Sequence, residues 1–104
     1  MKNERGANSL KSLPFDERAE EFKNVIKGLT LGIPDLQVRQ DFESFGHLVI
    51  ELHRLSGEEK NNFEQEKIDP ALDNLRIKAK DESLEGQKVR NALNYLIDLE
   101  FSFF

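Results

Sequence analysis

The sequence has 104 residues, with 20 acidic and 15 basic side chains and a formal net charge of −5. This negative charge argues against sequence-independent binding to DNA or RNA and against docking on anionic lipid. The chain has no cysteine, which excludes disulfides, thiolate metal sites and thiol nucleophiles.

The beginning of the sequence is polar and shows no hydrophobic periodicity. We therefore expect residues 1–11 to form a flexible N-terminal tail and residues 12–104 to form a single helical domain. No segment has the pattern of a secretory signal, and no stretch approaches the roughly 20 apolar residues that a membrane helix needs. Together with the absence of cysteine, this pattern indicates a cytoplasmic protein.

The first helix is predicted over residues 14–28. Ser12 is its expected N-cap, and Pro14 lies just inside the start, where the missing N–H costs nothing. Gly28 and then Gly32 mark its end. Apolar side chains recur at alternating spacings of four and three residues, so they share one helical face. That face comprises Phe15, Ala19, Phe22, Ile26 and Leu29.

The second helix is predicted over residues 34–55, with Pro34 at its start. The same alternating spacing continues for about four turns, and additional apolar residues widen the stripe. A face this broad indicates contact with at least two other elements. Its central positions are Val38, Phe42, Phe45, Val49 and Leu52.

Two further helix starts are expected in the segment that follows. Ser56 and Glu59 form a capping box, and Asp69-Pro70 has the pattern of a second N-cap followed by proline. Residues 74–80 also alternate between apolar and polar side chains. A short strand is therefore the alternative interpretation of that stretch.

The last predicted helix begins after Asp81 or Ser83, either of which is a suitable N-cap. Gly86 in its first turn is expected to weaken it by up to about 1 kcal/mol relative to alanine. The apolar face of this helix is set by Val89, Ala92, Leu93 and Leu96.

The helical pattern is interrupted at Glu100. If the helix continued, this carboxylate would lie at the centre of the apolar face. We therefore expect the helix to end near Leu99, with the phenylalanines that follow folded back. Residues 95–103 also alternate strictly, so an edge strand is the alternative there.

The fold class predicted from these patterns is all-α, a small four- to five-helix bundle with short connections. The alternative is an α+β fold with short strands near residues 74–80 and 95–103. Neither an internal repeat nor a convincing domain boundary is present in the sequence.

A metal-dependent enzyme is one alternative function. Glu43, His47 and Glu51 are spaced at i, i+4 and i+8, a stripe of ligands that could suit a hard divalent metal. Helical projection places this stripe opposite the apolar face, whereas metal sites in helical bundles point inward. We expect a solvated stripe, and hence no metal and no cofactor.

The other histidine, His53, projects near the apolar face of the second helix. The expected role is a boundary histidine with one ring nitrogen satisfied, and the alternative is a pH-sensitive contact. No nucleophile elbow, phosphate-binding loop or zinc-protease motif is present. We therefore expect neither an enzyme nor a small-molecule substrate.

The phenylalanines near the end of the sequence indicate a function in binding. Burying one phenylalanine is worth about 1.5–3 kcal/mol, so these side chains either complete the core or meet another chain. The sequence predicts a small acidic protein–protein interaction domain, acting as an inhibitor, an immunity-type protein or a helical adaptor. An obligate homodimer that uses the phenylalanine cluster is the alternative. The expected partner-binding residues are Tyr95, Glu100, Phe101, Phe103 and Phe104.

Overall fold

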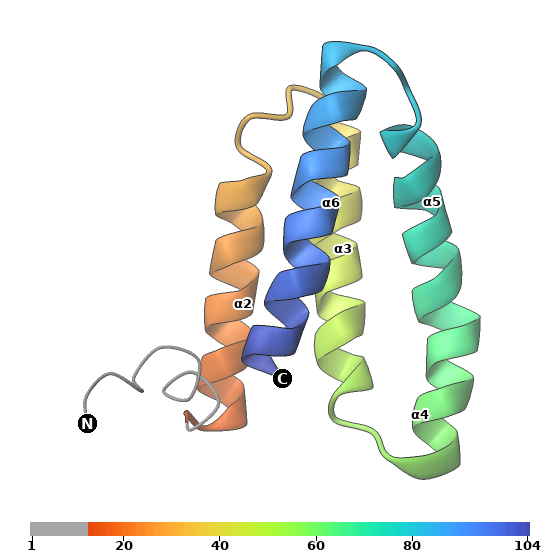
Figure 1. The fold of residues 1–104 in the computed structure, drawn as a ribbon. Coiled ribbons are helices and arrows are strands. Elements are labelled where there is room, and N and C mark those ends of the chain that lie inside the picture. Colours follow the sequence, from red (N-terminus) through yellow and green to blue (C-terminus); the bar gives the residue numbers. More distant parts are fainter. Residues whose placement is uncertain (1–12) are drawn as a thin grey trace.

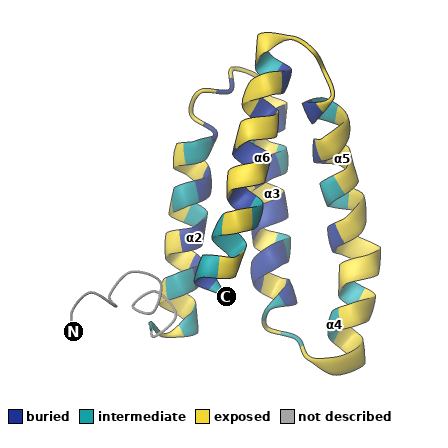
Figure 2. Ribbon diagram, in the orientation of Figure 1, coloured by how far each residue is buried: buried dark blue, intermediate teal, exposed yellow. Residues whose placement is uncertain are grey.

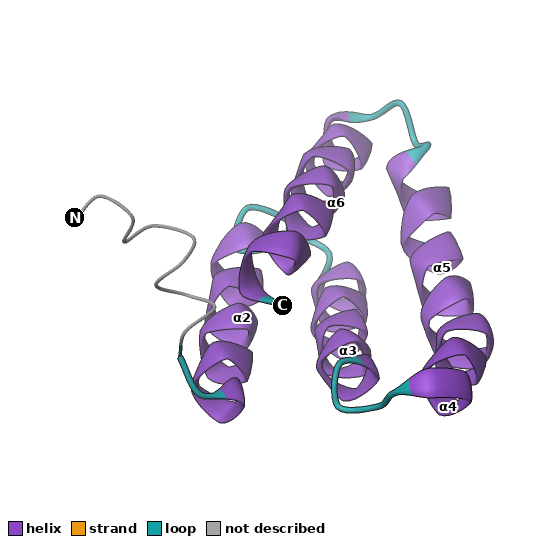
Figure 3. Cartoon of the chain, turned by 60° about the horizontal axis from the view of Figure 1, so that its bottom comes forward, coloured by secondary structure: helices purple, strands orange, loops and turns teal. Residues whose placement is uncertain are grey.

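The structure, a computed structural model, describes residues 13–104. Figure 3 shows helices and loops, with no strand, across this part of the chain. The predicted all-α helical bundle is therefore confirmed. The alternative strands near 74–80 and 95–103 were wrong, because helices occupy both stretches. The predicted tail over residues 1–11 and the predicted Ser12 cap lie outside the described residues.

Four helical segments run alternately up and down the bundle (Figure 1). The first two are α2 (Phe15–Leu29) and α3 (Leu36–Leu52). The third combines α4 (Gly57–Phe63), the π-helical segment η2 (Glu64–Ile68) and α5 (Asp69–Ala79), and the fourth is α6 (Leu84–Phe103). Helix α6 packs against both α2 and α5, while α3 packs against α2, η2 and α5.

The second helix is shorter than its sequence predicted. It begins after Asp35, whose side chain accepts a hydrogen bond of 2.9 Å from the backbone N–H of Gln37. It ends at Leu52 because the backbone N–H groups of Arg54 and Leu55 donate to carbonyls three residues earlier instead of four. One example is the bond of 3.1 Å from Leu55 to the carbonyl of Leu52. The predicted extension to residue 55 is therefore a turn.

The predicted helix start at Asp69-Pro70 is confirmed in position, because α5 begins at Asp69 with Pro70 in its first turn. The expected N-cap role of Asp69 was wrong, because the chain is already helical before this residue. Proline lacks an N–H, and its ring clashes with the carbonyl four residues earlier in a regular helix. The π-helical segment accommodates this, since the N–H of Asp69 donates to the carbonyl of Glu64, five residues earlier. The chain therefore remains helical from Gly57 to Ala79 instead of stopping before Pro70.

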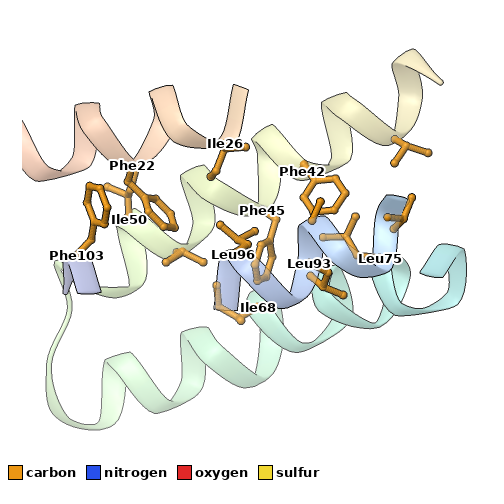
Figure 4. Close-up of a cluster of buried hydrophobic side chains, with 14 of the residues drawn as sticks. Phe22, Ile26, Phe42, Phe45, Ile50, Ile68, Leu75, Leu93, Leu96 and Phe103 are labelled. Carbon is orange, nitrogen blue, oxygen red and sulfur yellow. The ribbon is translucent and has the colours of Figure 1, made fainter. Parts of the chain in front are cut away.

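The core lies between the four helical segments, on their inward faces (Figure 2). The predicted apolar stripes of the first, second and last helices point into it, which is why their four-three spacing was a reliable guide. Figure 4 shows these side chains meeting from different helices. The fully buried side chains of the core include Phe22, Phe42, Leu75 and Leu96.

Gly86 allows the α5–α6 loop to approach the start of α6 closely, which its position in the sequence did not reveal. The hydroxyl of Ser83 accepts a hydrogen bond of 3.2 Å from the N–H of Gly86, which caps α6. A Cβ atom at Gly86 would collide with the backbone carbonyl group of Asp81 in the α5–α6 loop. Glycine is therefore required here by close approach of the loop to the helix.

Replacing Gly86 by alanine tests this requirement. An ordinary helical glycine gains up to about 1 kcal/mol of stability from this change. Because backbone atoms block the new methyl group, we expect Gly86→Ala to lower the free energy of unfolding by about 1–3 kcal/mol instead. Urea denaturation followed by circular dichroism measures the difference.

Gly28→Ala is the matched control, because the corresponding Cβ atom in α2 meets nothing within 4 Å. This variant should be as stable as the unmodified protein or more so. Equal gains in stability for the Gly28 and Gly86 variants would contradict the packing described for the α5–α6 loop.

Candidate functional site

Two of the predicted partner-binding residues lie in an aromatic cluster at one end of the bundle. Helix α6 continues to Phe103, so the predicted helix end near Leu99 was wrong. The Phe103 side chain is 3% exposed, and its ring centroid lies 5.7 Å from that of Phe22. The ring of Phe104 lies 5.3 Å from Phe22 and 5.5 Å from Phe15. Phe103 and Phe104 therefore pack against α2.

Glu100 is accommodated on the inward side of α6 by a partner from α3. Its Oε2 atom lies 2.8 Å from Nε2 of His53, and the two side chains are 31% and 20% exposed. The His53 ring also stacks on Phe104, with centroids 4.5 Å apart and an interplanar angle of 11°. The predicted boundary histidine with one satisfied ring nitrogen is thus confirmed.

Arginine side chains surround the same cluster. The Nη1 atom of Arg18 donates a 2.9 Å hydrogen bond to the carbonyl of Phe103, one of the last carbonyls of α6, which lack partners within the helix. Its guanidinium lies 5.6 Å from the ring centroid of Phe15 and 5.9 Å from that of Phe104. Arg54 lies 4.7 Å from Phe15 on another side. The contacts of Arg18 hold the end of α6 on α2.

The stripe of Glu43, His47 and Glu51, which was expected to be solvated, lies on the exposed side of α3, where all three residues are exposed. Among residues 13–104, no group of three or more His, Cys, Asp or Glu side chains could hold a metal ion. Glu43 and His47 instead border a pocket of about 240 Å³ between α2 and α3. Lys23 and Lys27 line the same pocket, so its charge is mixed.

The two remaining aromatic candidates are exposed, Phe101 by 75% and Tyr95 by 53%. They lie on different sides of α6, because six positions at 100° per residue place them about 120° apart. Tyr95 borders a pocket of about 390 Å³ toward α2, together with Leu29 and Ile33. Phe101 follows Ile97 by one turn, so the two residues lie on the same side of α6.

A groove of about 410 Å³ runs between α5 and α6. Its floor contains the buried side chains of Ala79 and Leu93 and the partly buried side chain of Ile97. Polar residues form its rim: Arg76, Lys80, Arg90 and Asn94. Sequence reasoning missed this groove, although positions 90, 94, 97 and 101 follow one edge of the predicted helix.

The groove is locally basic in a chain of net negative charge. Arg90 is held in place, since its Nη1 atom donates to the carbonyls of Ala79 at 2.7 Å and Asp81 at 3.4 Å. Arg76 makes a loose contact of 4.0 Å with exposed Asp73. Lys80 is exposed and has no ion-pair partner among residues 13–104. The groove therefore offers positive charge beside an apolar floor.

Comparisons with protein-family models, with curated proteins and with solved structures gave no match for this chain. Across residues 13–104, the structure contains no helix with both the length and the apolar character needed to cross a membrane. A function for the chain must therefore be inferred from its own surface, which includes the α5–α6 groove and the exposed side chain of Phe101.

The two neighbouring phenylalanines Phe101 and Phe103 should behave very differently when truncated. We expect Phe103→Ala to lower the free energy of unfolding by about 3–5 kcal/mol, because it leaves a cavity beside Phe22. Phe101→Ala should change it by less than about 0.5 kcal/mol, since most of this side chain is in water. Chemical denaturation of both variants measures the contrast, and a large loss of stability in Phe101→Ala would contradict the placement of that residue.

A double-mutant cycle tests the pairing of Glu100 with His53. We expect His53→Ala and Glu100→Ala to be coupled by about 0.5–1.5 kcal/mol, the usual net value of a partly buried hydrogen bond. The exposed pair Arg54–Asp16, at 3.3 Å, is the control and should show a coupling energy below about 0.5 kcal/mol. Additive effects of His53→Ala and Glu100→Ala on unfolding would show that the two side chains do not interact.

Proposed function

We propose that this domain acts by binding another protein, as an inhibitor, an immunity-type protein or a helical adaptor. The observation that carries the proposal is the exposed apolar edge of α6, where Phe101 is 75% exposed next to the α5–α6 groove. An exposed aromatic side chain beside an apolar groove is typical of a protein-binding surface. The proposal involves no catalytic step, no metal and no small-molecule substrate.

The placement of the phenylalanines favours a different protein over an obligate homodimer. A homodimer interface built from the phenylalanine cluster would need Phe103 and Phe104 at the surface. These side chains instead pack on Phe22 within one chain, and Glu100 pairs with His53. Phe101 and Tyr95 remain available for binding, and they lie on separate sides of α6.

The proposed compartment is the cytoplasm. Its support comes from the sequence, which contains no cysteine and therefore needs no oxidising environment to fold. An inhibitor or an adaptor would act there by occupying a surface of its partner, which requires only the exposed face described above and no rearrangement of the core.

Photo-crosslinking from Phe101 tests the proposed function. The full chain would carry benzoylphenylalanine at this position and be illuminated in the cells that produce it. We expect a covalent adduct with another protein, because an interface side chain lies within reach of its partner. A variant that carries the same group at Leu31, an equally exposed position at 74%, is the control and should give no such adduct.

Light scattering on the unmodified protein distinguishes the homodimer. An adduct of twice the chain mass together with a dimeric particle would favour the homodimer alternative. A monomer that yields no adduct from position 101 or from position 95 would contradict the proposed function.

A further inference from the structure

The α5–α6 groove and the edge of α6 beyond it form one continuous surface. Arg90, Asn94, Ile97 and Phe101 follow one another at spacings of four, three and four residues, which places them in a single row along α6. The row spans about three helical turns, or about 16 Å. Positive charge lies at the Arg90 end of the row, which is near the end of α5, and the apolar side chains of Ile97 and Phe101 lie toward its other end.

The helices of the bundle leave the lower part of this row uncovered. The end of α6 is held on α2 through Phe103 and Phe104, whereas η2 packs against α3. The molecule measures 44 × 35 × 17 Å along its principal axes, so it is a flat bundle and not a square one. Phe101 is consequently 75% exposed even though it lies one turn beyond the groove residue Ile97.

Charge decides which kind of partner suits the row. Arg76 and Lys80 contribute positive charge across the groove from Arg90. The Arg90 guanidinium is engaged by the carbonyl of Ala79, whereas the side chains of Arg76 and Lys80 are exposed to a partner. Acidic side chains would find favourable interactions at this rim. A second copy placed symmetrically on the same row would instead bring two basic rims together.

The N-terminal segment of the chain has the wrong charge for this surface. Residues 1–12 contain three basic side chains and one acidic side chain, Glu4. Their net positive charge would be repelled by Arg76 and Lys80. An acidic segment of another protein therefore fits the charge of the rim better than residues 1–12 or a symmetrically placed second copy.

We infer that the α5–α6 groove binds an acidic amphipathic helix of another protein, an inference that rests on the proposed function. The apolar face of the partner helix contacts Leu93, Ile97 and Phe101. On the partner helix, the anchoring side chains are spaced at i, i+4 and i+7. Its acidic residues cluster at the end that meets Arg76 and Lys80. This arrangement fixes the direction of the partner helix as well as its position.

Fluorescence anisotropy with designed peptides tests the inference on the full chain. The first labelled peptide, about 18 residues long, forms an amphipathic helix with a leucine stripe and glutamates clustered at one end. A second peptide carries lysine at each glutamate position. A third has the composition of the first in an order that destroys the stripe. A single-stranded oligonucleotide of similar charge is the fourth probe.

We expect the acidic amphipathic peptide to bind at least about tenfold more tightly than the other three probes, because it alone satisfies both the floor and the rim. Added salt should weaken its binding, since part of the attraction is between exposed charges. Equal binding of the lysine peptide or of the scrambled peptide would overturn the inference. Equally tight binding of the oligonucleotide would show a general polyanion surface and would overturn it as well.

Substitutions in the groove test whether the peptide binds there. Lys80→Glu and Ile97→Ala should each weaken binding of the acidic peptide by about tenfold, and Phe101→Ala should do the same. Lys27→Glu is the charge-matched control on α2, away from the groove, and should leave binding unchanged. Circular dichroism shows whether each variant is folded. A loss of binding in Lys27→Glu equal to that in Lys80→Glu would overturn the assignment to this groove.

The crosslinking experiment separates failure of this inference from failure of the proposed function. If position 101 crosslinks to another protein while the acidic peptide does not bind, the inference is wrong and the proposed function stands. If neither position 101 nor position 95 gives an adduct and no peptide binds, both are wrong.

Discussion

The pairing of Glu100 with His53 is the contact on which one end of the bundle depends. A carboxylate on the apolar side of a helix is costly unless it has a hydrogen-bond partner. His53, from the end of α3, supplies that partner at 2.8 Å, and α6 therefore continues for another turn. Through that turn Phe103 and Phe104 reach α2, where their rings close the core around Phe22. A polar pair thus permits the burial of the most apolar part of the sequence.

The same contact shapes the surface. Since the end of α6 is held on α2, it diverges from η2, which packs on α3. Ile97 and Phe101 lie on the side that is left open, and the basic residues at the end of α5 lie across the groove from Arg90, at the other end of the row. The exposed apolar edge is therefore a consequence of how the interior is packed. The direction in which α6 runs therefore determines both the packing of the core and the exposure of the proposed binding surface.

The sequence predicted the helices well where a repeated spacing left few alternatives, as for the stripes around Phe22 and Phe42. It failed at Glu100, because the partner that makes the carboxylate acceptable lies 47 residues away and no local pattern reveals it. It placed a helix start at Asp69-Pro70 but missed that a π-helical segment joins that helix to the one before it. Among the candidate binding residues, helical spacing could not separate buried Phe103 from exposed Phe101 once the helix was expected to stop. The groove belongs to two helices at once, so no single stretch predicts it.

The π-helical segment before Pro70 has a mechanical consequence. Helix α4 contains one apolar side chain, Phe63, which is partly buried against the core, and none of its residues is fully buried. It joins the rest of the bundle through η2, where the regular hydrogen-bond ladder is interrupted. Displacing α4 about this hinge costs few buried contacts, whereas displacing α5 would break the core at Leu75. We therefore expect local unfolding to cost less free energy in α4 than in α5.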